Sequence, residues 1–441
     1  MNQAAEKLDL LIEARWIIPI QPAELTLEHH AVAIRGGRIV DILPIAEARQ
    51  RYNAASTTSL PEHVLIPGLI NLHAHTAMSL LRGYADDMPL MDWLQDAIWP
   101  AEKQHVSDSF VFDGTLLGAA EMLRSGITCV NDMYFHPDAS ARAYDQLGMR
   151  AVVGITVLDF PTGYAADAED YIRKGLEARD QWRDHARIKF ALAPHAPYSL
   201  GNTSLERVSS LAEELDALVH IHLQETAGEV QQSLAEHGIR PLERLRSLGL
   251  LGPNLLAAHA VHVTDAEIAV MAEHNVRVIH NPVSNMKLAS GAAPVARMLS
   301  AGVCVGLGTD GAASNNRLDI LQEMRMAALL AKVSSGDASA LSTHQALRMA
   351  TLNGAIALGM QDEIGSIENG KKADLTAIRM DSLETTPVFN PASHLTYVVG
   401  REHVDHVWID GKAMISGGEM LHDDNVDLLR NSRLWQSTVG Q

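Results

Sequence analysis

The chain has 441 residues, 47% of them hydrophobic and 20% charged, so it can bury a large core and is not intrinsically disordered. Its formal net charge of −19 makes nucleic acids and anionic membrane surfaces unfavourable partners. Two cysteines, no signal-peptide pattern and no long uninterrupted apolar stretch lead us to expect a reduced, cytoplasmic protein that does not cross a membrane.

Both ends of the chain have the pattern of short β-strands joined by turns, and the middle alternates strands with helices. The N-terminal part has a hairpin signal at Arg35–Arg38, and the C-terminal part has a turn at Asp410-Gly411. Between them we expect eight buried strands separated by amphipathic helical segments. The expected strands are Leu65–His75, Ile127–Met133, Ala151–Val157, Ile188–His195, Ala217–Leu223, Leu255–His259, Val276–Asn281 and Val303–Thr309.

This order predicts an α/β fold with a (β/α)8 TIM-like barrel and a small β-sandwich domain formed from both chain ends. We assign residues 65–364 to the barrel, and residues 1–64 and 365–441 to the β-sandwich. Functional side chains of such a barrel gather at the C-terminal ends of its strands. The polar residues at those ends are therefore the candidates for a site.

Two histidines stand at the end of the first expected strand, in the segment Pro67–His75. Side chains alternate faces along a strand, so His73 and His75 point the same way from one rigid support. Each neutral imidazole offers a nitrogen lone pair, and two that converge suit a transition metal ion. The chain contains 21 histidines, so a chance pair is a real alternative unless other strand ends supply further ligands.

The fifth and eighth strands end in residues that complete such a site. His222 lies nearer the strand tip than His220, so we expect His222 to bind the metal and His220 to lie one layer deeper. Asp310 follows the eighth strand and adds a carboxylate. The predicted ligand set, with an open position for water, is His73, His75, His222 and Asp310.

Residues near these tips also suit hydrolytic chemistry. A divalent metal lowers the pKa of bound water towards ~7, and Asp310 can accept the proton that this water loses. Glu225 follows His222 without belonging to the ligand set, so it can carry protons to and from a substrate. His259, at the tip of the sixth strand, can orient the attacking hydroxide. The set predicts hydrolytic attack on a trigonal carbon, either a carbonyl or an amidine-like ring carbon.

Over essentially its whole length the chain resembles the amidohydrolase superfamily. The residues that carry this resemblance are Pro67–His75, His222, Ala258-His259 and Thr309–Gly311. Within the superfamily the chain is most similar to the 5-methylthioadenosine/S-adenosylhomocysteine deaminases, in the branch that also holds s-triazine chlorohydrolases. The segments that support this branch are Met78–Asp87, Leu90–Leu94, Ile98–Glu102 and Pro194–Ser199.

The resemblance implies an activity and roles for individual residues. The implied reaction is hydrolytic deamination of adenine nucleosides, above all 5′-methylthioadenosine to 5′-methylthioinosine and ammonia, with S-adenosylhomocysteine and adenosine as further substrates. Glu102 is expected to bind the ribose hydroxyls, and His195 to contact the substrate. Glu225 would protonate the purine ring nitrogen, and Asp310 would pass a proton to the departing ammonia.

The resemblance also bears on the cofactor and on one departure from the family pattern. The position where two-metal relatives carry a bridging lysine corresponds to His195, so we expect one metal ion per subunit, with zinc as first choice and iron as the alternative. Relatives offer an arginine near the third strand, whereas Arg150 opens that strand here. Recognition of the 5′ substituent is therefore left open, with Asp159–Pro161 as candidates to shape that part of the pocket.

Two other functions fit the same sequence features. The first is a chlorohydrolase or aminohydrolase of triazines or another heterocycle, such as a guanine-type deaminase, in which Glu102 would not bind ribose. The second is an inactive scaffold or binding protein on the same fold, which would be expected to have lost its metal ligands. For the enzyme we expect a small-molecule nucleoside as partner, and a homo-oligomer of a size that the sequence does not define.

Overall fold

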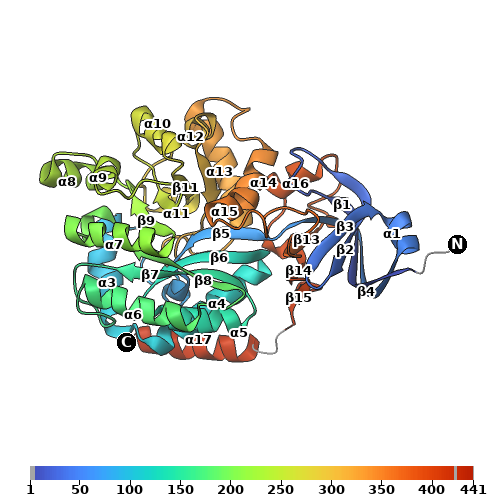
Figure 1. Ribbon diagram of the computed structural model, residues 1–441, viewed down its shortest axis with the longest axis horizontal. Coiled ribbons are helices and arrows are strands. Elements are labelled where there is room, and N and C mark those ends of the chain that lie inside the picture. Colours follow the sequence, from blue (N-terminus) through green and yellow to red (C-terminus); the bar gives the residue numbers. More distant parts are fainter. Residues whose placement is uncertain (1–4, 422–424, 441) are drawn as a thin grey trace.

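The computed structural model describes residues 5–421 and 425–440, whose strands form two eight-stranded sheets (Figure 1). One of them, sheet B, is parallel and has the order β12-β11-β10-β9-β8-β7-β6-β5. Its two outer strands meet where the Asp310 amide donates to the His73 carbonyl at 2.9 Å, which closes the ring. The predicted (β/α)8 barrel is confirmed.

The barrel strands are apolar and buried because helices cover one face and side chains fill the interior. They are β5 (Leu69–Ala74), β6 (Ile127–Tyr134), β7 (Arg150–Val157), β8 (Ile188–Pro194), β9 (Val219–Leu223), β10 (Leu255–His259), β11 (Arg277–His280) and β12 (Cys304–Leu307). All except the first match the expected strands to within two residues at either end.

The first expected strand, Leu65–His75, was wrong as a single element. The chain passes from sheet A, where β4 (Tyr52–Pro67) ends, into the barrel strand β5, and the break lies at Gly68. A Cβ atom at this glycine would lie 2.1 Å from Oγ1 of Thr128, so only glycine allows this close approach. The segment therefore joins the two sheets.

Helices follow the strands and form the outer layer of the barrel (Figure 1). They are α4 (Asp108–Arg124), α5 (Pro137–Gln146), α6 (Ala168–Gln181), α7 (Asn202–Leu215), α8 (Ala227–His237), α9 (Pro241–Ser247), α10 (Asp265–Glu273), α11 (Pro282–Lys287), α12 (Val295–Ser300), α13 (Ile320–Ser335), α14 (Thr343–Ala350) and α15 (Leu352–Ala357). The long connection after β5 holds the short elements η1 (Thr76–Leu81), α2 (Leu90–Asp92), η2 (Trp93–Ile98) and α3 (Trp99–His105). Within the described residues, no helix combines the length and the apolarity that crossing a membrane requires.

Sheet A is built from both ends of the chain and has the order β16-β15-β14-β13-β4-β1-β2-β3. Its strands are β1 (Glu6–Ile17), β2 (Leu27–Arg35), β3 (Arg38–Pro44), β4, β13 (Leu375–Arg379), β14 (Val404–Ile409), β15 (Lys412–Ser416) and β16 (Glu419–Met420), with α1 (Ile45–Arg51) between β3 and β4. Ile12, Ile34 and Trp408 belong to one buried apolar cluster, so the two chain ends share a core. The second domain of the predicted fold is thus confirmed.

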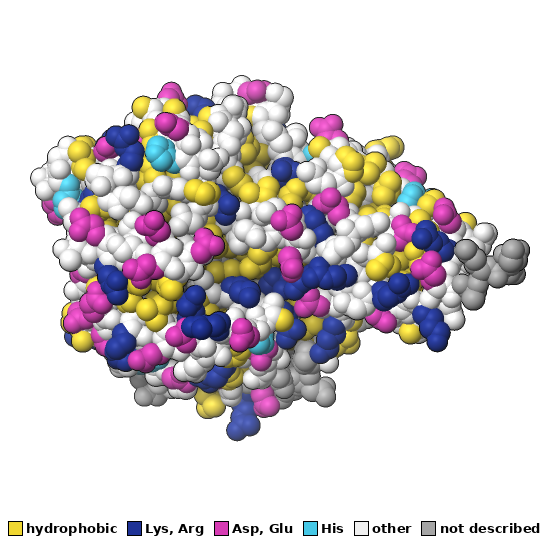
Figure 2. Space-filling view, viewed as in Figure 1, with side chains coloured by type: hydrophobic (Ala, Val, Ile, Leu, Met, Phe, Trp, Pro, Cys, Tyr) yellow, Lys and Arg dark blue, Asp and Glu magenta, His cyan; other side chains and the backbone are white. Residues whose placement is uncertain are grey.

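An ion-pair network joins the barrel to sheet A. Arg150, at the start of β7, is 3% exposed, and its guanidinium lies 2.9 Å from both Asp374 and Asp410. Arg150 thus lies at the N-terminal end of the barrel, as expected of a structural residue there. Figure 2 shows that lysine and arginine side chains gather on this face where the two parts meet.

The C-terminal residues return to the barrel after sheet A. Beyond α16 (Pro391–Tyr397) and η4 (Arg401–His403), helix α17 (Asn425–Val439) lies along α4 (Figure 1). Trp435 donates to Asp113 at 2.8 Å, and its ring lies 5.2 Å from that of Phe110. Part of the range 365–441, which the sequence assigns to the β-sandwich, thus packs on the barrel. The domain limits otherwise stay predictions.

Candidate metal centre and substrate cavity

Four side chains meet at the C-terminal mouth of the barrel. His73 is the last residue but one of β5, His75 follows the strand, His222 lies on β9, and Asp310 follows β12. One ligand atom from each lies within 4.8 Å of the others. The Nε2 atoms of His73 and His75 lie 3.2 and 3.3 Å from Asp310 Oδ1. The structure thus brings together the four residues that the sequence predicts as metal ligands.

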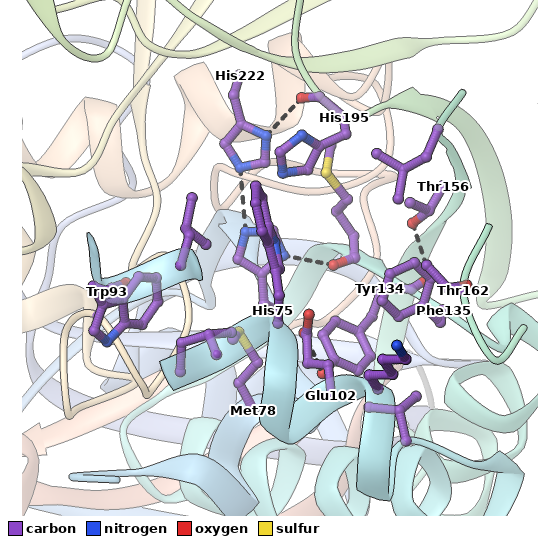
Figure 3. Close-up of a pocket in the computed structure, with 18 of the residues that line it drawn as sticks. His75, Met78, Trp93, Glu102, Tyr134, Phe135, Thr156, Thr162, His195 and His222 are labelled. Carbon is purple, nitrogen blue, oxygen red and sulfur yellow. Dashed lines mark hydrogen bonds between the residues drawn. The ribbon is translucent and has the colours of Figure 1, made fainter. Parts of the chain in front are cut away.

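Backbone carbonyls fix the tautomers of two of these histidines. His75 donates from Nδ1 to the Met133 carbonyl at 2.6 Å, and His222 donates from Nδ1 to the His195 carbonyl at 2.7 Å (Figure 3). Each ring then directs its Nε2 lone pair into the cluster, where the two Nε2 atoms lie only 3.2 Å apart. Two facing lone pairs repel each other unless a proton or a metal cation lies between them.

The pKa values of the histidines also indicate that the cluster favours a bound positive charge. Burial lowers the pKa of His73 to about 4, although Asp310 opposes this shift. At His75 burial alone would lower the pKa, but the hydrogen bond to Asp310, the charges of Asp310 and Asp132 and the hydrogen bond to the Met133 carbonyl together raise it to about 9. The buried His73 Nε2 has no hydrogen-bond partner of good geometry. Together these observations fit a divalent metal ion held by the four side chains.

Asp310 is held in place by groups outside the ligand set. Its Oδ2 accepts hydrogen bonds from Ser284 and Ser314 at 2.7 and 2.9 Å, and its Oδ1 accepts one from the Gly311 amide at 2.9 Å. Burial would raise the pKa of this carboxyl, but the neighbouring His73 and His75 hold it well below its usual range. Asp310 is therefore ionised, as a ligand and proton acceptor must be.

The structure places His220 below the cluster rather than in it. Its Nε2 lies 2.8 Å from Nδ1 of His73, and its Nδ1 lies 3.1 Å from the Asn131 amide. His220 is fully buried and does not line the cavity. It supports the orientation of the His73 ring, in the deeper position that the sequence predicts.

Glu225 and His259 lie beside the ligand cluster, as predicted. His259 Nε2 is 3.7 Å from Glu225 Oε2, and His259 Nδ1 lies 2.8 Å from Oδ1 of Asn285. Burial raises the pKa of the Glu225 carboxyl, while the Ser290 hydroxyl donates to it at 3.1 Å. A raised pKa favours the protonated form of a carboxyl group, which can give its proton to a substrate.

The cluster opens into a cavity of about 620 Å³. Most of its lining is apolar and includes Trp93, Trp99 and Phe160. Figure 3 shows Trp93 and Phe135 around the cavity together with His75 and His222. Such a volume and composition are typical of a small-molecule site with a few polar groups that orient the ligand.

Glu102 and His195 line the same cavity. Glu102 Oε1 accepts a hydrogen bond from the Tyr134 hydroxyl at 2.7 Å, and burial raises the pKa of Glu102 to about 7. The Nδ1 of His195 lies 3.1 Å from the Ser199 hydroxyl. Of the predicted metal ligands and catalytic residues, all but the fully buried His73 line this one cavity, and His73 lies behind it in the ligand cluster.

Sequence reasoning missed several residues that hold the site. Tyr134 ends β6, and Ser284 and Asn285 follow β11, so all three come after buried strands. Polar residues at the C-terminal ends of the second and seventh barrel strands were the sequence features from which these three residues could have been predicted. Ser290 and Ser314 lie in loops, whose positions the sequence pattern does not define.

The expected pocket-shaping segment Asp159–Pro161 contributes only in part. Phe160 and Pro161 line the cavity, whereas Asp159 turns away and accepts hydrogen bonds from the Gly201 amide and the Ser204 hydroxyl, both at 2.5 Å. Among the described lining residues there is no arginine, and Lys103 is the one basic side chain other than histidine.

Comparisons with known proteins agree with this geometry. The model of the amidohydrolase family matches residues 64–414. The 5-methylthioadenosine/S-adenosylhomocysteine deaminases of Saccharophagus degradans and Teredinibacter turnerae are 45% and 44% identical to the chain; the alignments cover 98% of this chain in both cases, and 97% and 98% of those proteins.

Solved structures give the same result. An adenosine deaminase from Xanthomonas campestris with bound zinc is 49% identical, with a TM-score of 0.98 over 99% of this chain and all of that one. An atrazine chlorohydrolase from Arthrobacter aurescens shares the fold at 24% identity, with a TM-score of 0.90 over 97% of this chain and all of that one. The family match and the identity over almost the full length show that the chain belongs to the amidohydrolase family.

Proposed function

We propose that this chain is a zinc-dependent aminohydrolase of adenine nucleosides, with 5′-methylthioadenosine as its principal substrate and S-adenosylhomocysteine and adenosine as further candidates. One observation carries the proposal: the half-buried carboxylate of Glu102 lines the same cavity as Glu225, His259 and the predicted metal ligands His75, His222 and Asp310. Relatives at 44–45% identity that are named deaminases of these nucleosides support it.

The predicted ligands would hold a single catalytic zinc ion, with His73, His75 and His222 as nitrogen donors and Asp310 as oxygen donor. When bound, the metal supplies a water molecule whose pKa is lowered towards ~7. Zinc suits three imidazoles and a carboxylate, and the zinc-bound structure at 49% identity supports this choice over iron.

The protein side chains supply the proton transfers. Glu225, whose pKa is raised by burial, donates its proton to the purine ring nitrogen as the water oxygen attacks C6. Asp310 accepts one proton of the water and gives it to the amino group, which leaves as ammonia, and the second proton of the water returns to Glu225. The C6–N bond breaks, a C6–O bond remains, and the adenine ring becomes hypoxanthine.

Other residues orient the two reactants. His259 lies next to Glu225 and is held through Nδ1 by Asn285, so it can position the attacking hydroxide. Glu102, when ionised, can accept hydrogen bonds from both ribose hydroxyls at once, and Tyr134 fixes its carboxylate. His195 lines the cavity beside them and would contact the substrate.

The apolar wall supports a 5′ substituent without charge. Trp93, Trp99 and Phe160 offer surface for a thioether, and Lys103 is the one lysine or arginine in the described lining that could pair with a carboxylate. This composition is the reason to rank 5′-methylthioadenosine before S-adenosylhomocysteine.

An ammonia-release assay tests the proposal across 5′-methylthioadenosine, S-adenosylhomocysteine, adenosine, guanine and melamine. We expect turnover of the adenine nucleosides with the absorbance change from adenine to hypoxanthine. Turnover of melamine or guanine alone would favour the heterocycle hydrolase. A purified protein that contains no metal and shows no turnover after zinc is added would favour the inactive scaffold. We further propose that the protein is a cytoplasmic homo-oligomer. Light scattering would measure its mass.

A further inference from the structure

A second group of metal-binding side chains lies in sheet A, outside the catalytic cavity. It consists of His63 on β4 with Asp405 and His406 on β14, and one potential ligand atom of each lies within 4.8 Å of the others. Their side chains are 11%, 17% and 16% exposed, so the group is largely buried but can be reached from solvent.

The pairing of three strands puts these residues on one face of the sheet. Strand β13 lies between β4 and β14, where Arg379 pairs with His63 and Ala377 pairs with His406. In antiparallel strands, residues directly opposite each other point to the same face of the sheet. Ala377 and Arg379 also point to one face, because side chains two positions apart along a strand lie on the same side. The two histidines therefore face the same side across β13, and the small Ala377 leaves room between them.

A β-bulge adds the third side chain. Ala377 pairs with His406 but Ile378 pairs with Val404, so Asp405 is an extra residue in β14. Neighbouring side chains in a regular strand point to opposite faces, and a bulge re-aims one of them. The bulge thus lets Asp405 turn towards the same point as His406.

The distances are those of a metal site. The Nε2 atoms of His63 and His406 lie 2.9 and 3.3 Å from the same carboxylate oxygen, Asp405 Oδ2. Neighbouring ligand atoms of a tetrahedral zinc ion, bound at about 2.0–2.2 Å, are about 3.3 Å apart. The His406 ring also stacks on Trp408 at 5.4 Å, which fixes its orientation.

The charges around His63, Asp405 and His406 are compatible with a bound cation. In the described part of the chain Asp405 has ion-pair contacts with the two histidines but with no lysine or arginine, and Arg379 on the same face pairs with Asp381 at 3.3 Å. Without a metal, His63 donates from Nε2 to Asp405 Oδ2 at 2.9 Å, so a bound cation would replace this one proton. The buried Nδ1 of His63 has no hydrogen-bond partner.

We propose that His63, Asp405 and His406 form a second metal site that binds Zn²⁺ or another divalent transition metal that prefers imidazole, with water in the open position. The metal would connect β4, from the N-terminal part of sheet A, to β14, from its C-terminal part. Because such a site exists only in the folded state, bound metal would stabilise the fold. The site is independent of the proposed catalytic activity.

Equilibrium dialysis of the full-length protein against Zn²⁺, followed by elemental analysis, tests this site. We expect two zinc ions per chain in the wild type, and one in His406→Phe, which keeps a ring against Trp408, and in the isosteric Asp405→Asn. His29→Ala removes an exposed histidine from β2 and serves as the matched control, with unchanged zinc content. One zinc per wild-type chain, or equal zinc in wild type and both variants, would overturn the proposal.

A melting experiment separates this site from the catalytic one. In a His73→Ala protein, added Zn²⁺ should still raise the Tm, and the additional change His406→Phe should abolish that rise. The catalytic rate of zinc-loaded His406→Phe should equal that of the wild type, because the residue lies in sheet A rather than at the mouth of the barrel. A zinc-dependent rise in Tm that survives His406→Phe would assign the effect to other groups.

Discussion

At the scale of single residues, Glu225 is the side chain whose environment most directly predicts its role. Its carboxyl is buried, and burial raises its pKa, while Ser290 and His259 hold its two oxygens from either side. The raised pKa favours the protonated carboxyl, whose proton is directed to the ring nitrogen of a purine in the proposed mechanism.

Replacing Glu225 with Gln should lower kcat for 5′-methylthioadenosine by about 10²–10⁴-fold, because proton transfer from this position is lost. KM should change little, since the amide keeps the shape of the side chain. Steady-state kinetics gives both constants, and elemental analysis should find the catalytic metal retained. A kcat within a factor of about three of the wild type would remove Glu225 from the mechanism.

The raised pKa of Glu102 leads us to predict that substrate binding depends on pH. Burial raises its pKa to about 7, so the carboxylate that accepts the ribose hydroxyls is present above that pH and is lost as the pH falls below it. The KM for nucleosides should therefore rise as the pH falls from about 8 to about 6, approaching a tenfold change per pH unit at the acid end.

The variant Glu102→Gln checks the cause of this dependence. Its KM for nucleosides should be high at every pH in that range, because an amide oxygen cannot replace the ionised carboxylate. Free adenine-like bases, which lack ribose, should be processed equally by both proteins. The same pH profile of kcat/KM in wild type and variant would show that another group titrates.

At the scale of elements, the turn between β9 and α8 positions Glu225. Gln224 in this turn has a φ of 50°, which is costly for a residue with a side chain. Glu229, in the first turn of α8, accepts hydrogen bonds from the amides of Gln224 and Glu225 at 3.0 and 2.8 Å. Its carboxylate thereby holds the turn in the conformation that directs Glu225 into the cavity.

Glu229→Gln should destabilise this turn by about 1–3 kcal/mol, because an amide NH2 would face one of the two backbone N–H groups. We expect a lower Tm and a fall in kcat larger than the change in KM. Glu236→Gln, at an exposed position on the same helix, is the control and should change neither. Loss of stability with an unchanged kcat and pH profile would make Glu229 purely structural.

The strand pattern explains why the metal ligands could be predicted from the sequence. His73 and His75 alternate at one strand end, and His222 and Asp310 stand at two others, so the barrel topology alone brings them together. Tyr134 beside Glu102 could not be predicted as a partner, because α3 reaches the cavity only through the packing of a long connection. The extra residue Asp405 in β14 was equally unpredictable, since a bulge leaves no periodic signal.

At the scale of the whole molecule, α17 connects the end of the chain to the barrel. Trp435 packs on Phe110 and donates to Asp113, both on α4, and Val439 belongs to the same apolar cluster as Trp93 and Ile98. The sequence predicts that both chain ends contribute to a second domain, but it does not predict where a short amphipathic helix docks, because that depends on the shape of the barrel surface.

Trp435→Ala should lower the free energy of unfolding by about 2 kcal/mol, somewhat less than a fully buried tryptophan would cost. The neighbouring Leu434 is 60% exposed, so Leu434→Ala is the matched control and should have little effect. Denaturant unfolding gives both values. Equal destabilisation by the two variants would indicate that the contacts of Trp435 with α4 do not hold α17 on the barrel.

The central claim is that metal held by His73, His75, His222 and Asp310 is required for hydrolytic deamination of an adenine nucleoside. The most direct test measures ammonia release from 5′-methylthioadenosine by the purified protein, by the same protein after chelation, and again after zinc is added back. We predict activity in the first sample, none in the second and recovery in the third. Undiminished turnover by the metal-free protein, or no turnover by the zinc-loaded protein, would contradict the claim.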